Sequence, residues 1–162
     1  MTQIKQKIDR PFTKYPAWGI LILVLYRNEA GMSAPKKVFL ISPVRRIDQE
    51  TETKIAAYIA GLENREYRVF WPKRDNPHEE TDRIGLAICE ENRRAIYEAD
   101  EIHVWFDPTS QGSVFDFGMT FAFLWFTRKN FKIVIANSEA VQPTPHKSFQ
   151  NVLLALHARG CR

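Results

Sequence analysis

From Lys37 onward the chain alternates short apolar runs with longer amphipathic stretches, and this alternation constrains its fold more than any other feature. A short apolar run bounded by turn residues is typical of a buried strand, and a longer amphipathic stretch is typical of a helix. The chain is therefore expected to run strand, helix, strand, helix, strand, helix, strand, helix. The expected strands are 37–42, 67–72, 101–107 and 131–136, and the expected helices are 47–65, 81–100, 113–129 and 148–160.

This order predicts a single α/β domain with three layers, in which a mostly parallel sheet of about four to five strands is flanked by helices, as in Rossmann-like and flavodoxin-like folds. A chain of 162 residues, 44% of them hydrophobic, has material for one sizeable core. Ligands of such sheets bind beyond the carboxyl ends of the strands. Functional residues are therefore expected after Ile41, Phe70, Phe106 and Ile135, and the Pro-containing stretches 72–82 and 142–147 are expected to be surface loops.

The first 31 residues form an N-terminal extension that precedes the expected domain at 32–162. The apolar run 18–26 follows several basic residues, but it is much shorter than the roughly 20 residues of a membrane-spanning helix. No membrane partner is therefore expected. The extension can be a loose segment, an alternative start or an added strand, and the sequence does not choose among these.

Charge and cysteine content exclude several other classes of protein. The net charge of +4 is interspersed along the chain, without the basic, aromatic-rich run that is typical of a nucleic-acid binder. Two cysteines, Cys89 and Cys161, suggest no disulfide framework, so a reducing, cytoplasmic compartment is expected. Because the four histidines lack the spacing of ligands, we expect no metal and no other cofactor.

The stretch Asp107–Met119, D-P-T-S-Q-G-S-V-F-D-F-G-M, is the most informative part of the sequence. It leaves a strand, turns at Gly112 and enters a helix, so that backbone N–H groups together with Ser110 and Ser113 can hold an anion at the helix N-terminus. Asp116 is then expected in the first turn, facing either the ligand pocket or solvent. A plainer interpretation is that Ser113 caps the helix and Asp116 complements the helix dipole, an arrangement worth about 1 kcal/mol.

Two further polar loops are expected at the same edge of the sheet. The first strand is followed by Ser42-Pro43-Val44-Arg45 and the second by Trp71-Pro72-Lys73-Arg74-Asp75. Since the carboxyl ends of parallel strands share one edge, the three loops should converge there. This convergence favours a ligand site near Asp116 over a purely structural role.

Three of these features, in order, resemble the nucleoside 2-deoxyribosyltransferase-like family, which includes the 2′-deoxynucleoside 5′-phosphate N-hydrolases. They are the first strand with its polar loop, the N-R-R-A-I-Y-E-A-D stretch at 92–100 and the G-x-x-x-acid-x-G stretch at 112–118. The resemblance covers roughly residues 37–136. It implies that Asp116 stands where the family has a catalytic Glu, whose carboxylate attacks C1′ of the sugar while the base departs. Aspartate is one methylene shorter, which departs from the family pattern.

The resemblance also implies how the substrate is held. Ser110 stands where transferases of free nucleosides carry an Asp, whereas the 5′-phosphate hydrolases carry Ser, and Arg45 matches an Arg that contacts phosphate in those hydrolases. Asn92 stands at a family Asp that contacts the departing base, and an amide cannot act there as a proton donor. Phe115 is expected to stack on the base. The expected substrate-binding residues are thus Ser42, Arg45, Asn92, Ser110, Gly112, Ser113 and Phe115.

The sequence favours an N-glycosidase that acts on nucleoside 5′-monophosphates, with Asp116 as the catalytic residue. Base exchange between deoxynucleosides, a nucleotide-binding sensor without turnover, and a pure interaction protein are the alternatives. The helix 113–129 is apolar nearly all round, which indicates burial against another subunit. We therefore expect a small-molecule nucleoside or nucleotide ligand and a homodimer or higher homo-oligomer, as the resemblance also implies.

Overall fold

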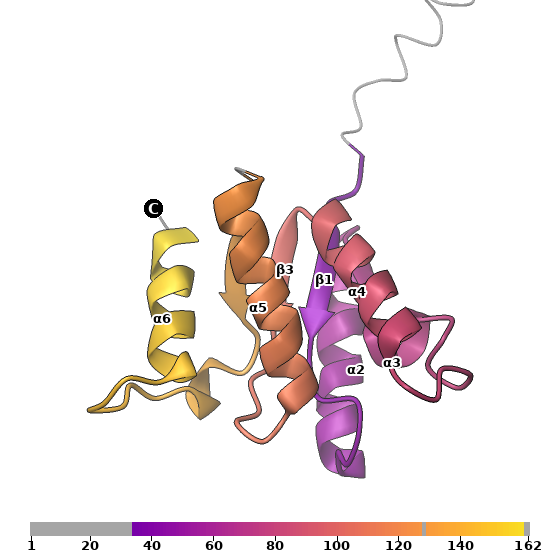
Figure 1. Ribbon diagram of the computed structural model, residues 1–162, viewed down its shortest axis with the longest axis horizontal. Helices are drawn as coiled ribbons and strands as arrows, with labels where there is room; N and C mark the ends of the chain where they lie inside the picture. Colours follow the sequence, from indigo (N-terminus) through magenta and orange to yellow (C-terminus); the bar gives the residue numbers. More distant parts are fainter. Residues whose placement is uncertain (1–33, 128, 161–162) are drawn as a thin grey trace, which may run out of the picture. The chain divides into compact units, whose positions relative to one another are not determined.

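The four apolar runs form one parallel sheet in the computed structural model, which describes residues 34–127 and 129–160 (Figure 1). The strands are β1 (Lys37–Ile41), β2 (Arg68–Phe70), β3 (Glu101–Val104) and β4 (Lys132–Ile135), in the spatial order β2-β1-β3-β4. In the register of the central strands, Phe39 pairs with Phe70 on one side and with Ile102 on the other. The sheet belongs to a compact unit that starts at Pro35, and the expected extension at 1–31 lies outside the described residues.

Five α-helices connect and cover these strands, which confirms the prediction of a single-domain, three-layer α/β fold with a parallel sheet. They are α2 (Gln49–Glu63), α3 (Pro72–Asp75), α4 (Leu86–Glu98), α5 (Gln111–Phe126) and α6 (Phe149–Gly160), and a 3-10 turn covers Ser138–Ala140. Figure 1 shows α4 and α5 side by side in front of β1 and β3.

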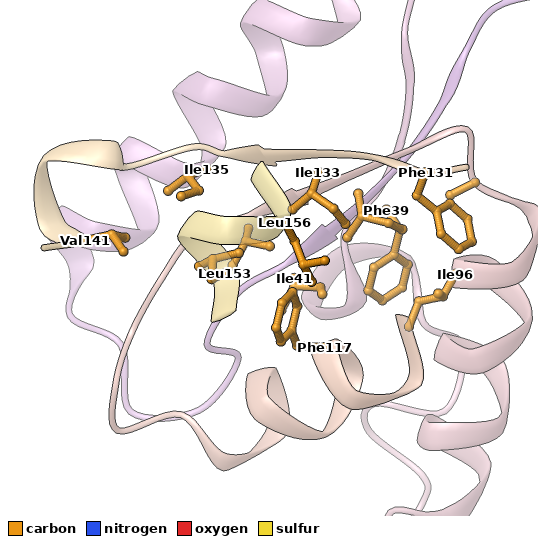
Figure 2. Packing of buried hydrophobic residues seen from close by; sticks show 13 residues of the cluster. Phe39, Ile41, Ile96, Phe117, Phe131, Ile133, Ile135, Val141, Leu153 and Leu156 are labelled. Atoms are coloured by element: carbon orange, nitrogen blue, oxygen red, sulfur yellow. The ribbon is translucent and has the colours of Figure 1, made fainter. Parts of the chain in front are cut away.

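The two faces of the sheet carry separate hydrophobic clusters, because alternate residues of each strand point to opposite faces. On one face, α4, α5 and α6 bury the larger cluster, which Figure 2 shows; it includes Phe39, Ile41, Ile96, Ile102, Phe117, Ile133, Leu153 and Leu156. On the other face, α2 packs Ile55, Ile59 and Leu62 against Val38 and Leu40. Both faces of the central strands are therefore buried, which explains why these strands are continuous apolar runs.

A buried polar network crosses β3 on the α2 face. Glu101 accepts hydrogen bonds from Lys36 Nζ at 3.1 Å and from His103 Nε2 at 3.2 Å, and Lys132 Nζ lies 3.5 Å from the same carboxylate. Burial raises the pKa of Glu101, but the bond from His103 and the two ammonium groups outweigh it and hold that pKa below its usual value. Burial lowers the pKa of His103, so its ring is neutral and its Nδ1 can accept from the Tyr58 hydroxyl at 2.8 Å.

Two of the boundaries that differ from the sequence prediction are set by side chains that bond the backbone locally. The helix expected from residue 81 begins only at Leu86, since the Asp82 carboxylate accepts backbone N–H groups of Ile84, Gly85 and Ile88 in a preceding loop. Gly85 ends that loop with a φ of 87°, a conformation that favours glycine. The expected surface loop at 72–82 is wrong for its first four residues, which form α3.

Helix α3 begins with a buried proline, whose fixed φ suits the first turn of a helix. The Asp75 carboxylate then accepts the Trp71 backbone N–H at 2.8 Å and closes the turn. The segment after the second strand is therefore anchored, and only the part beyond it remains a loop.

Truncation of a central strand side chain should be costly. Ile102 is fully buried in β3, so Ile102→Ala is expected to lower the free energy of unfolding by about 2–5 kcal/mol through lost contacts and the cavity left behind. Ile84→Ala is the matched control, because that side chain is 84% exposed. Urea unfolding of both variants measures the difference, and equal stability of the two would contradict the described core.

Candidate functional site

A cleft of about 550 Å³ opens at the carboxyl edge of the sheet, between the loop after β1, helix α4 and the start of α5. Its volume falls in the range of small-molecule sites, which is roughly 300 to 1,000 Å³. The structure brings seven of the eight predicted site residues together in its lining: Ser42, Arg45, Asn92, Ser110, Gly112, Phe115 and Asp116. Ser113 is the one predicted residue that does not line the cleft.

Asp116 lies in the cleft lining although its side chain belongs to the buried face of α5. That face consists of Ser113, Asp116, Phe117 and Thr120, at the i, i+3, i+4, i+7 spacing of one helix side. Because α5 begins at Gln111, Asp116 falls in the second turn of the helix and not in the first turn as expected from sequence. Only 7% of the residue is exposed, so α5 carries a carboxylate where the helix face meets the cleft.

A chain of hydrogen bonds reaches Asp116 from two neighbouring elements. Asn92 Nδ2, on α4, lies 3.4 and 3.3 Å from the two carboxylate oxygens of Asp116. Asn92 Oδ1 in turn accepts from Asn76 Nδ2 at 2.9 Å, and the same Asn76 nitrogen donates to the Ile88 carbonyl at 3.1 Å. Since Asn76 occupies the oxygen of the Asn92 amide, the amide nitrogen is directed at Asp116. Asn76 follows α3 and was not identified from the sequence.

The environment of Asp116 makes its carboxyl group unusual. Burial raises its pKa to about 6, while the hydrogen bond from Asn92 lowers it by a smaller amount. Among the described residues, no lysine, arginine or histidine forms an ion pair with it. A carboxylate with this pKa is mostly ionised at neutral pH, and as a buried anion without a cation it favours a ligand that carries or develops positive charge.

Two consecutive arginines, Arg45 and Arg46, line the cleft in the loop after β1. Arg46 has a φ of 59°, in the left-handed region that costs a non-glycine residue roughly 1–2 kcal/mol. Strain of this kind persists where the surrounding structure fixes it, often at ligand sites. Arg46 was missed by sequence reasoning, because a backbone conformation of this kind has no sequence signal at an arginine. The guanidinium groups can bind phosphate oxygens in pairs.

The start of α5 is capped by Ser110 and not by Ser113. Ser110 Oγ accepts the Ser113 backbone N–H at 3.3 Å, and the two hydroxyl groups lie 2.8 Å apart. The Ser113 side chain is buried beside a small apolar cavity under Phe149 and Leu153 of α6, away from the cleft. Ser113 therefore orients Ser110, while Ser110, Gln111 and Gly112 present the helix N-terminus to the cleft.

Two further cleft residues come from the α3–α4 connection and from α4. Glu79 lies in the connection and was not identified from the sequence, where it falls in an expected surface loop. Cys89 is a free thiol, and burial together with the charge of Asp116 raises its pKa, so it stays protonated at neutral pH. Of the other predicted residues, Ser42 accepts from Trp71 Nε1 at 2.9 Å, and Phe115 is exposed at the cleft.

Searches against models of protein families, curated proteins and solved structures find no match. Within the two described ranges, every helix is too short or too polar to cross a lipid bilayer. In the same ranges, no three His, Cys, Asp or Glu side chains cluster as ligands of a metal ion.

Burial of Asp116 should make the protein less stable at neutral pH than a variant without the charge. The folded pKa of about 6 lies above the unfolded value of 3.8, so the protonated form is favoured by folding and stability is lost as the pH rises through 6. A shift of about two pH units corresponds to about 3 kcal/mol. Asp116→Asn is therefore expected to be more stable than the wild type at pH 8 by up to about 3 kcal/mol.

The gain should shrink between pH 6 and pH 4 and vanish at lower pH, where both side chains are neutral. Denaturant unfolding of the two proteins from pH 4 to pH 8 measures it. A wild type that is as stable as the variant at pH 8 would show that Asp116 is not a strained buried charge.

Proposed function

We propose that the protein is an N-glycosidase that cleaves the base–sugar bond of nucleoside or deoxynucleoside 5′-monophosphates, with Asp116 as the nucleophile. The observation that carries this proposal is the buried Asp116 carboxylate, which forms no ion pair within the described residues, in a cleft whose lining also holds two arginines. The substrate phosphate is negative, whereas positive charge develops on the sugar in the transition state. The arginines can bind the phosphate, and the Asp116 carboxylate can stabilise the positive charge. The motifs that resemble the nucleoside 2-deoxyribosyltransferase-like family point to the same chemistry.

The reaction needs a carboxylate beneath the sugar. As the bond between C1′ and the base nitrogen breaks, positive charge develops at C1′, and the Asp116 carboxylate attacks that carbon. The resulting glycosyl-enzyme is then hydrolysed by water, as in retaining glycosidases. Because Asn92 donates to Asp116, it holds the carboxylate in place and favours its ionised form.

The 5′-phosphate is proposed to bind at Arg45, Arg46 and the N-terminus of α5. A guanidinium can hold two phosphate oxygens, and backbone N–H groups at a helix start add a favourable dipole. Ser110 at this position adds no negative charge, whereas an acid there would repel a phosphate. This combination favours a monophosphate over a free nucleoside, and hydrolysis over base exchange.

We also propose that the protein self-associates through α5. An exposed apolar stripe runs along this helix and consists of Val114, Phe121 and Trp125, with Gly118 between them. Trp125 is 78% exposed, and a large aromatic side chain in water favours burial against a partner. Phe115 is exposed next to the stripe and also lines the cleft, so a second copy on this helix would adjoin the site.

Base release should depend on Asp116 and on the 5′-phosphate. The test incubates the protein with nucleoside 5′-monophosphates and the matching nucleosides and follows free base by chromatography. Asp116→Ala and Asp116→Asn are both expected to lose at least about 10³-fold in kcat, the order typical for loss of a nucleophile. The pH profile of the wild type should rise through about pH 6 as Asp116 ionises.

Arg45→Ala should lower kcat/KM for monophosphates and leave nucleosides nearly unchanged. Arg83→Ala is the matched control, because Arg83 is exposed and does not line the cleft. Transfer of the sugar to an added base, faster than hydrolysis, would favour a deoxyribosyltransferase. Saturable binding without base release from any substrate would replace the enzyme proposal with a nucleotide-binding sensor.

Disruption of the exposed apolar stripe on α5 should dissociate the oligomer. Trp125→Lys is expected to weaken self-association by at least about thirtyfold, the effect of losing an aromatic contact worth about 2 kcal/mol. Ile84→Lys is the control, since it alters an exposed apolar residue in the α3–α4 connection, outside α5. Sedimentation velocity over a range of concentrations measures both, and a wild type that stays monomeric at every concentration would contradict the proposal.

A further inference from the structure

A base that leaves C1′ needs a proton, and the residue at position 92 cannot supply it. The departing nitrogen receives the electron pair of the broken bond, and protonation of the base makes it a better leaving group. Asn92 stands on the helix wall beside Asp116, but its amide has no acidic proton. If the cleft is the glycosidase site proposed above, another group must act as the acid.

Glu79 is the other carboxyl group in the described lining of the cleft. Apart from Asp116, the lining of described residues contains no second aspartate, no other glutamate and no histidine. Asp82 in the same connection is occupied, since its two oxygens accept three backbone N–H groups. The Cys89 thiol has a raised pKa and is therefore a poor donor. Glu79 is therefore the residue of the lining that is the candidate proton donor to the leaving base.

The position of Glu79 is fixed by the same residues that hold Asp116. The Glu79 backbone N–H donates to the Asn76 carbonyl at 3.3 Å, and the Asn76 side chain bonds Asn92, which bonds Asp116. The Asn76 oxygen Oδ1 also accepts the His78 backbone N–H at 2.9 Å and so shapes the turn that leads to Glu79. Within the described residues, the Glu79 carboxylate forms no ion pair, so it is available to a ligand.

We propose that Glu79 is the general acid and base of the reaction. In the first step the C1′–N bond breaks, its electron pair goes to the base, the base nitrogen takes the proton of the Glu79 carboxyl group, and Asp116 forms a bond to C1′. In the second step water attacks C1′, the bond to Asp116 breaks, and Glu79 takes a proton from that water. The products are the free base and the sugar 5-phosphate, with Asp116 ionised and Glu79 protonated again.

A leaving group that needs no proton separates acid catalysis from any other role of Glu79. The test compares wild type, Glu79→Gln and the neighbouring control Glu80→Gln on a natural nucleoside 5′-monophosphate and on the 4-nitrophenyl glycoside 5-phosphate of the same sugar. Glu80 is exposed and does not line the cleft. Glu79→Gln is expected to lose about a hundredfold or more in kcat on the natural substrate, as for loss of a general acid.

On the nitrophenyl substrate, Glu79→Gln should still form the glycosyl-enzyme. Its burst of nitrophenolate should have a rate close to that of the wild type. Equal activity of Glu79→Gln and Glu80→Gln on the natural substrate would overturn the inference, and so would a nitrophenolate burst that is slowed as much as turnover of the natural substrate. Either result leaves the proposed function intact, whereas a wild type that releases no base would remove that function itself.

Discussion

The buried hydrogen-bonded chain from Asn76 through Asn92 to Asp116 is the interaction on which the candidate site depends. It joins the end of α3, the middle of α4 and the second turn of α5, which are separate in sequence. Because each amide group has both a donor and an acceptor satisfied, the chain has one direction, and it ends on the carboxylate. Loss of one member would leave a buried polar group unpaired, which is costly in the protein interior.

The order of strands and helices along the chain and the edge of the site were predictable because they depend on local patterns. Apolar runs located the strands, and parallel strands bring their carboxyl ends to one edge, so Arg45 and Asp116 were expected there together. Asn92 was expected at the site from the family resemblance alone. Asn76 and Glu79 were not predicted, because their roles depend on how a proline-containing connection folds back on α4. The Ser110 cap was misassigned by three residues, since either serine can cap a helix on sequence alone.

The cleft is lined by positive groups on one side and by a negative group on another. The loop after β1 brings two positive charges, one of them in a strained backbone conformation, and α5 brings a negative charge that burial disfavours. Both features lower stability, and neither is needed to build the sheet. Their coincidence in one cavity distinguishes this region from exposed ion pairs such as Lys54–Glu50 and Arg94–Glu98, which are worth little.

The network around Glu101 lies at the opposite end of the sheet from the cleft. Lys36, Glu101 and Lys132 join β1, β3 and β4 where these strands begin, whereas the cleft lies where they finish. A shift of β3 by a single residue would turn Glu101 to the other face of the sheet and break its contacts with Lys36 and Lys132. Strand alignment is therefore secured far from the ligand, so the loops of the cleft can diverge in sequence without loss of the framework that holds them.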